Sequence, residues 1–379
     1  MINNHTRRFQ TTTKTGIVLI SLAACLAFAW PALGGAAEGP TSRPGGPSRA
    51  KDAAPTTTGP APIAKRDHPF VAMADGLFEA QFRASGGKIY SAMYLTRPWR
   101  EVAAELVSNP PPQKVTVFQC RGPQDEVLEA FRPVADQFII FLFHHASLRA
   151  PGPDDRVWPG VNHPLLNRIR DVPPIAGGAR VYALIHVLGE ETAVWGLDAE
   201  RGVRFEEVQW MAVAVMGGDY GGILWRTDVN ISPWPDRLHA LETAIRAYSD
   251  DLGNSSAVVG WVEGPPGQPI TTRCSDKKLF IFLLHPDYMS FDPAGKSIRE
   301  PVEARDCQGQ VVIHPPEGWR VESGRTLSGA PLKLDRDGAV LRTHYYFRGG
   351  GEVLILDLKG SATSATEPIA GAGDNLRKE

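Results

Sequence analysis

The segments VYALIHVL (residues 181–188), FEEVQWMAVAVM (205–216) and GGILW (221–225) follow one another along the chain and decide the fold. The first and the third are apolar almost without a break, as expected for strands covered on both faces of a parallel sheet. In the middle segment, apolar residues recur at helical spacing, and two glycines follow where a helix would end. Strand, helix and strand in this order predict parallel strands joined by a right-handed crossover.

The same alternation extends in both directions, so we expect one α/β domain over residues 67–254. Further strands are predicted at residues 70–74, 90–95, 114–119 and 137–143, and further helices begin at Pro98, Pro123 and Pro235. Proline is harmless in the first helical turn, because the N–H that it lacks has no helical partner there. The proline-rich residues 146–179 interrupt the pattern, with a short helix predicted near 165–169.

After residue 254 the helical spacing disappears, and an all-β sandwich domain is expected over residues 255–360. Short strands are predicted at residues 257–263, 278–284, 302–305, 310–314, 332–334, 340–347 and 353–358. Turn pairs such as Asp337-Gly338 separate them. Regular short strands with turn signals between them favour a sandwich.

The N-terminal residues predict export. Residues 1–37 place basic residues before an apolar stretch and then small residues, the order of a secretory signal peptide. We therefore expect a mature chain that begins near Glu38, lies in the periplasm or outside the cell, and has no membrane span. The alternatives are a retained membrane anchor and a lipoprotein, because LAAC (residues 22–25) resembles a lipoprotein signal with Cys25 as the lipid acceptor.

Two segments lack the apolar residues of a core. Residues 38–66 and 361–379 are rich in proline, glycine, alanine, serine and threonine, which predicts a disordered linker and a disordered tail. The formal net charge of −2 gives no broad field to attract nucleic acid, so nucleic acid is not an expected partner.

Three cysteines remain after the signal peptide. Cys274 and Cys307 lie in the same predicted sandwich, and an oxidising compartment would allow a disulfide between them, leaving Cys120 unpaired. Their spacing does not predict a zinc site, and no cofactor is implied.

The stretch from residue 181 to residue 252 resembles the last units of a (β/α)8-barrel glycoside hydrolase. The resemblance rests on the strand ending HVLG, the helix VRFEEVQWMAVAVMGG, the strand GGILWR and the helix PDRLHALETAIRAYSDDLG, with a β-sandwich after them. It implies a barrel of βα units and an activity on glycosidic bonds. A full barrel takes about 250 residues, more than residues 67–254 supply, so we expect a partial or shortened barrel.

Working residues of such folds lie just beyond the carboxyl ends of the strands. Glycoside hydrolysis uses two carboxyl groups, and the predicted catalytic candidates are Glu190, Glu191 and Asp75. Glutamates in a loop after a strand are also ordinary solvated charges, which is the alternative interpretation of Glu190 and Glu191.

A second group of strand-end residues is predicted to bind substrate. Its members are His144, His145, His186, Gln119, Trp158, Trp195, Trp225, Arg226 and Asp228. Histidines transfer protons and contact ligands, and tryptophan rings suit the apolar faces of sugars. Structural histidines and tryptophans that pack loops against the barrel are the alternative.

These patterns predict an exported glycoside hydrolase-like protein, active or inactive, that acts on or binds an extracellular carbohydrate. The alternative is a non-catalytic cell-envelope module that binds carbohydrate or protein. The sequence leaves the oligomeric state open.

Overall fold

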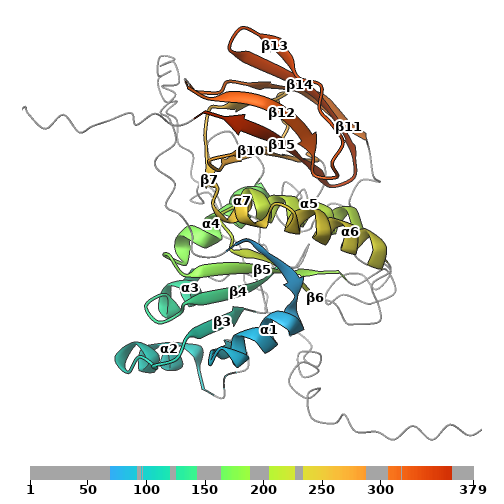
Figure 1. Cartoon of the computed structure of the whole chain (residues 1–379). Coiled ribbons are helices and arrows are strands. Elements are labelled where there is room, and N and C mark those ends of the chain that lie inside the picture. The colour runs from blue at the N-terminus through green and yellow to red at the C-terminus, as the bar shows by residue number, and fades with distance from the viewer. Residues whose placement is uncertain are drawn as a thin grey trace, which may run out of the picture. The chain divides into compact units, whose positions relative to one another are not determined.

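The computed structural model describes residues 69–91, 95, 97–119, 125–142, 164–187, 205–226, 234–286, 306–316 and 318–360 (Figure 1). All of them belong to one compact unit, Pro55–Glu379. The predicted signal peptide, linker and tail lie outside the described residues. Among the described helices, none is long and apolar enough to cross a membrane.

Six parallel strands form the first sheet. They are β1 (Val71–Ala74), β2 (Lys88–Ser91), β3 (Val115–Gln119), β4 (Gln137–Leu142), β5 (Arg180–His186) and β6 (Gly222–Arg226), in the spatial order β1-β6-β5-β4-β3-β2. Each strand from β2 to β5 therefore lies beside its successor, and β1 lies beside β6.

Seven helices of the described residues accompany this sheet. They are α1 (Asp75–Ala84), α2 (Trp99–Ser108), α3 (Asp125–Phe131), α4 (Pro164–Ile175), α5 (Phe205–Gly217), α6 (Pro235–Arg246) and α7 (Ser249–Gly253). Buried residues of α2 to α7 pack into one large core with one face of the sheet. On the other face, Phe78 and Phe82 of α1 pack against β4, β5 and β6. In Figure 1, α5 and α6 accordingly lie on one side of the sheet and α1 on the other.

The handedness of the crossovers explains why α1 lies alone. Along the chain from β2 to β6, each new strand is added beside the previous one and always on the same side of it. Right-handed crossovers between these strands therefore place all their helices on one face of the sheet. The step from β1 to β2 crosses the whole sheet in the opposite direction, so its right-handed crossover puts α1 on the other face.

The structure contains no closed barrel among its described strands. The strand order is that of successive barrel strands, but β1 and β2 are not paired with each other, and α1 covers the face that would be the interior of a barrel. Where the sequence predicted a partial barrel, the structure has an open six-stranded parallel sheet.

Nine further strands in the described part of the chain are antiparallel. They are β7 (Ser256–Ala257), β8 (Val262–Glu263), β9 (Ile270–Cys274), β10 (Lys278–Leu284), β11 (Asp306–Ile313), β12 (Arg320–Thr326), β13 (Asp335–Asp337), β14 (Val340–Arg348) and β15 (Gly351–Lys359). They form the sheets β12-β15-β10-β9-β7 and β13-β14-β11-β8, and side chains of both sheets share one core. The part of the chain after α7 therefore has two packed antiparallel sheets.

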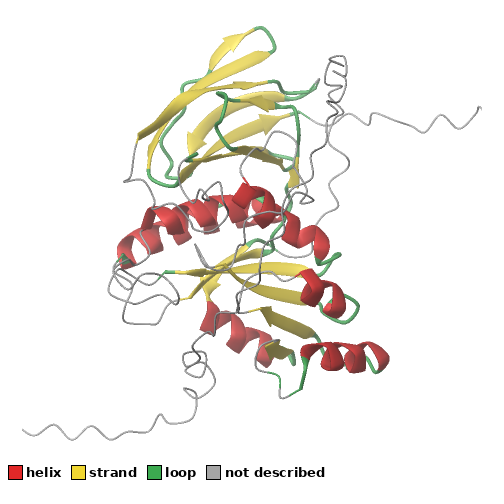
Figure 2. Cartoon of the chain, turned by 180° about the vertical axis from the view of Figure 1, so that it is seen from behind, coloured by secondary structure: helices red, strands yellow, loops and turns green. Residues whose placement is uncertain are grey.

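Helix α5 packs against both sets of strands. Phe280 and Phe282 of β10 and Ile355 of β15 belong to the same core as α5, whereas the alternate residues of these strands face the second sheet. The side chains of α5 also bond to the antiparallel region: Gln209 Nε2 donates to the Gly351 carbonyl at 2.9 Å, and Trp210 Nε1 donates to the His285 carbonyl at 3.2 Å. Figure 2 shows this helical layer between the parallel and the antiparallel strands.

Helix α4 is longer than predicted. It runs through Pro173 and Pro174, where the sequence predicted an end near residue 169. Pro173 cannot donate to the carbonyl of Ile169 four residues earlier. The Tyr220 hydroxyl donates to that carbonyl at 2.7 Å instead, so a tertiary contact satisfies the backbone group that the proline leaves.

The expectation of a disulfide is wrong, because Cys274 and Cys307 are separate buried thiols. Cys274 Sγ lies 3.0 Å from the Ser275 carbonyl, and Cys307 Sγ lies 3.2 Å from Gln268 Oε1. Burial raises the pKa of the Cys274 thiol to about 12, so this group stays protonated.

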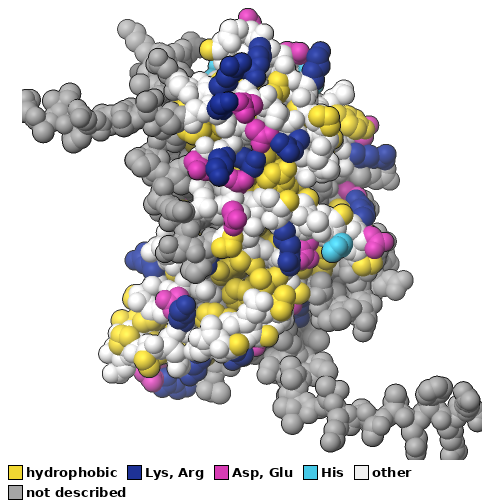
Figure 3. All heavy atoms as spheres, viewed as in Figure 1, with side chains coloured by type: hydrophobic (Ala, Val, Ile, Leu, Met, Phe, Trp, Pro, Cys, Tyr) yellow, Lys and Arg dark blue, Asp and Glu magenta, His cyan; other side chains and the backbone are white. Residues whose placement is uncertain are grey.

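Basic and acidic side chains are interspersed over the antiparallel strands (Figure 3). Asp357 carries the densest set of contacts: Lys278 Nζ donates to it at 2.8 Å, and Ser323 and Arg325 donate to its other oxygen. Burial opposes ionisation of this carboxyl, but the three donors outweigh it and lower its pKa to about 2.

We expect Asp357→Asn to lower the free energy of unfolding by about 1–2 kcal/mol at neutral pH, because it removes charge-assisted hydrogen bonds from a partly exposed group. A lowered folded-state pKa gives stability that is complete above the ordinary carboxyl value and lost as pH falls towards about 2. The difference between wild type and variant, from urea denaturation at a series of pH values, should therefore shrink below about pH 4. Asp335→Asn, whose partner Lys333 is mostly exposed, is the control. A constant difference down to pH 2 would contradict this assignment.

Candidate functional site

The strand order places a topological switch point at the carboxyl edge between β1 and β6. The connection after β1 leads to α1 on one face, and the connection after β6 leads to helices on the other. In open α/β sheets, ligands bind where neighbouring strands send their connections to opposite faces. The described part of this edge is therefore the candidate site.

Strand register places three predicted site residues in one row at this edge. Ala74 pairs with Trp225, so the next positions are Asp75 and Arg226, and Arg226 in turn pairs with His186 of β5. Neighbouring strands lie about 4.8 Å apart, so the backbone positions of Arg226 and His186 are adjacent, and Asp75 directly follows the last paired residue of β1. The structure describes only the backbone of His186.

Asp75 begins α1, and Arg226 contacts the core that α1 covers. Asp75 is the first residue of α1, is half-buried, and accepts a hydrogen bond from the Gly76 N–H at 2.9 Å. The Arg226 guanidinium carbon lies 5.2 Å from the centre of the Phe141 ring, which belongs to the core under α1. The row thus presents a carboxylate and a guanidinium on the α1 side of the switch point.

Arg226 has an unsatisfied donor. Its Nε atom is buried and has no hydrogen-bond partner among the described residues. Buried polar groups in proteins are almost always paired with protein, water or ligand. This N–H therefore lacks the acceptor that such a buried group usually has.

Trp225 is buried, with 1% of its surface exposed, and packs in the helix-covered core. Its indole Nε1 is a second buried donor without a partner among the described residues, but its position in the strand alternates with that of Arg226, so it faces the other side. The Trp225 ring is therefore part of the core, and a sugar could not stack on it without a rearrangement.

Gln119 lies outside the row. It ends β3, is 3% exposed, and is level with Ile140, Ala183 and Ile223 across the sheet. Gln119 is therefore level with a position three residues before Arg226 along β6, and it does not reach the carboxyl edge. The remaining candidates, Glu190, Glu191, His144, His145, Trp158, Trp195 and Asp228, lie outside the described residues. Within the described ranges, no three metal-ligating side chains gather.

Helix α1, which creates the switch point, was not predicted from the sequence. The segment DGLFEAQFRA follows β1 directly, and its two phenylalanines are four residues apart on one helical face. That spacing is the signal that could have identified α1.

The comparisons with known proteins give only coarse similarity. No protein-family model and no curated protein matches the chain. Among solved structures, an Anoxybacillus α-amylase is 11% identical, with coverage of 74% of this chain and 62% of the amylase and a TM-score of 0.42. An α-amylase from Geobacillus thermoleovorans is 10% identical, with 68% and 56% covered and a TM-score of 0.40. A Thermotoga maritima α-fucosidase is 14% identical, with 74% and 78% covered and a TM-score of 0.29.

The chain thus spans about three fifths of the length of the two amylases. Similarity at this level carries no argument about activity. The fold defines the class: an α/β protein with an open six-stranded parallel sheet, followed by packed antiparallel sheets.

Proposed function

We propose that this chain is an exported glycoside hydrolase-like protein that acts on or binds an extracellular carbohydrate at the carboxyl edge between β1 and β6. The export part of the proposal rests on the signal-peptide pattern of residues 1–37. The observation that carries the site is that Asp75 and Arg226 each follow one member of the last registered pair of β1 and β6, Ala74 and Trp225, and that the buried Nε of Arg226 lacks a partner among the described residues.

The chemistry of these two groups fits a sugar. Each sugar hydroxyl is both a donor and an acceptor, so it can donate to the Asp75 carboxylate while it accepts from Arg226. Neighbouring hydroxyls of one ring present both roles together, which suits two adjacent residues of opposite hydrogen-bonding character. A ligand that only accepts would satisfy Arg226 but would be repelled by Asp75.

Cleavage requires a second carboxyl group about 5–9.5 Å from the first. Asp75 is one member of such a pair, and Glu190, Glu191 or Asp228 is the proposed other. Without that second group the same edge holds a sugar and leaves it intact, which is the binding-module alternative. Hydrolysis and binding therefore have to be measured separately.

We expect the mature chain to bind at least one member of a polysaccharide panel, and Arg226→Gln to weaken that binding by 10- to 100-fold, since a hydrogen bond to a charged group contributes about 1.5–3 kcal/mol. Calorimetry measures the affinity, and a reducing-end assay measures cleavage. Arg100→Gln is the matched control, because Arg100 lies on α2 with 68% of its side chain exposed and pairs with Glu126. Equal carbohydrate affinity for the wild type and Arg226→Gln would contradict the proposed site. Cleavage products in the reducing-end assay would favour an enzyme over a binding module.

A further inference from the structure

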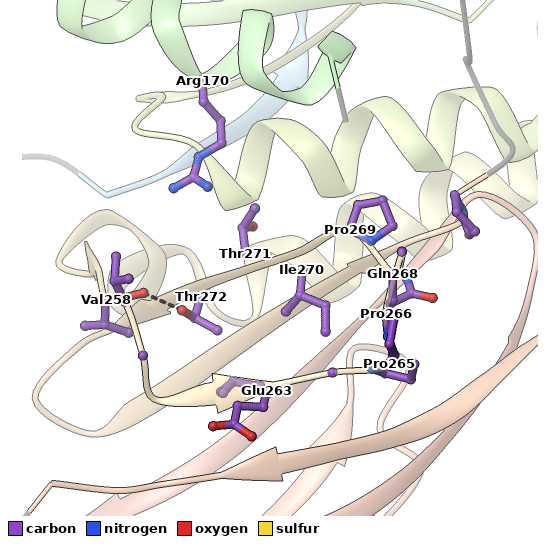
Figure 4. Close-up of a pocket in the computed structure, with 16 residues that line it drawn as sticks. Arg170, Val258, Glu263, Pro265, Pro266, Gln268, Pro269, Ile270, Thr271 and Thr272 are labelled. Atoms are coloured by element: carbon purple, nitrogen blue, oxygen red, sulfur yellow. Dashed lines mark hydrogen bonds between the residues drawn. The ribbon is translucent and has the colours of Figure 1, made fainter. Parts of the chain in front are cut away.

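A cavity of about 610 Å³ lies apart from the carboxyl edge. It is lined by Arg170 of α4, by the turn between β7 and β8, by the loop between β8 and β9, and by β9 itself (Figure 4). It shares no residue with the row of Asp75, Arg226 and His186. Its volume falls in the range of about 300–1,000 Å³ that is usual for small-molecule sites.

Part of the wall is aliphatic. Pro265, Pro266 and Pro269 come from the β8–β9 loop, Pro286 follows β10, and Val258 and Ile270 add branched side chains. None of the described lining residues is aromatic. The cavity therefore lacks the flat rings on which sugars stack, and it suits an aliphatic body better.

Two buried polar side chains, Arg170 and Thr271, line the same part of the wall. Arg170 is 8% exposed and Thr271 is 3% exposed, and Figure 4 shows both on the same side of β9. The Thr271 hydroxyl is buried and has no hydrogen-bond partner among the described residues. The Arg170 guanidinium has five N–H donors, so it can contact a ligand while it keeps a protein partner.

The buried charge on this wall is positive. Burial lowers the pKa of Arg170 to about 10, and neighbouring Asp171 acts in the opposite direction, so the guanidinium stays protonated at neutral pH. Glu263 also lines the cavity, but its side chain is 71% exposed and lies 3.4 Å from His314 Nε2. In Figure 4 Glu263 stands at the far side from Arg170.

We propose that this cavity binds a small organic carboxylate with an aliphatic body. The carboxylate accepts hydrogen bonds from Arg170 and Thr271, and the aliphatic part lies against the prolines of the β8–β9 loop. A carboxylate matches the buried cation in charge and the planar guanidinium in geometry.

Isothermal titration of the whole chain with hexanoate, hexanamide and acetate tests both halves of the proposal. Hexanoate should bind at least tenfold more tightly than its neutral amide, which lacks the charge, and than acetate, which lacks the aliphatic body. Equal affinity for hexanoate and hexanamide would overturn the role of Arg170. No detectable binding of hexanoate at 20 mM would overturn the site.

A pair of variants locates the binding. Val259 lines the cavity and is 62% exposed, so Val259→Trp should fill the mouth without disturbing a core and should abolish hexanoate binding. Val107→Trp introduces the same ring at another exposed position, on α2, and should leave binding unchanged. Thr271→Val keeps the shape of the side chain and should weaken binding by removing the hydroxyl. Hexanoate binding that survives Val259→Trp would place the ligand elsewhere and contradict the proposal.

Discussion

Gly350→Ala should lower the free energy of unfolding by roughly 3 kcal/mol or more, which makes it one of the two most damaging substitutions that we predict. A Cβ atom at this position would lie 2.0 Å from the Glu206 carbonyl oxygen and 2.6 Å from the Trp210 backbone nitrogen. Both are backbone atoms of α5, so no side-chain rotation can relieve the overlap. The turn between β14 and β15 and the buried helix would have to move apart.

Moving the β14–β15 turn away from α5 would break more than one contact. Gln209 of α5 donates to the Gly351 carbonyl, and Trp210 donates to the His285 carbonyl, so both hydrogen bonds span the interface that must widen. The midpoint of denaturation by urea measures the loss. Gly76→Ala is the control, because nothing lies within 4 Å of a Cβ atom at that helical glycine. It should leave stability unchanged or raise it by up to about 1 kcal/mol. If Gly350→Ala changed the free energy of unfolding as little as Gly76→Ala does, the β14–β15 turn would not pack closely on α5.

Phe82→Ala should cost about 3–5 kcal/mol, the usual range for removing a buried aromatic ring. Phe82 is 6% exposed and stacks on Phe78 with ring centres 6.1 Å apart, and Phe78 lies 4.8 Å from the Tyr182 ring of β5. These rings cover the face of the sheet that the other helices leave open. Their loss would expose apolar side chains of β4, β5 and β6 to water.

Leu77→Ala is the matched control on the same helix. Leu77 is 48% exposed, so its truncation should change the free energy of unfolding by less than about 1 kcal/mol. Denaturant titration of both variants compares the two sides of α1. If Phe82→Ala were as mild as Leu77→Ala, α1 would not be packed on the sheet, and the switch point between β1 and β6 would disappear with it.

Local pattern predicted the buried elements well. Strands β3 to β6 and helix α5 stand close to their predicted positions, because continuous apolar runs and helical spacing follow directly from burial. The predicted strand at residues 90–95 instead lies at Lys88–Ser91, and no strand forms at residues 332–334. Strands β9 (ITTRC) and β12 (RVESGRT) were not predicted, because their residues are mostly polar. Strand β9 forms by pairing with β10, and β12 forms by pairing with β15.

The arrangement of the site depends on pairing that local pattern does not contain. Asp75 and Arg226 were both predicted as strand-end residues, but they follow paired residues only because β1 pairs with β6, which lies about 150 residues later. Gln119 was predicted from the same rule, and the register of β3 leaves it below the edge. The predicted disulfide between Cys274 and Cys307 was wrong for a related reason. Two cysteines can share a core without their thiols being close enough, and correctly oriented, to form a bond.

The most direct test of the central proposal is a crystal structure of the mature chain with the tightest-binding oligosaccharide from the panel. We expect sugar hydroxyls within hydrogen-bond distance, about 2.7–3.2 Å, of Arg226 Nε and of the Asp75 carboxylate. A sugar bound over the antiparallel strands, or in the cavity beside Arg170, with the β1–β6 edge left unoccupied, would contradict it.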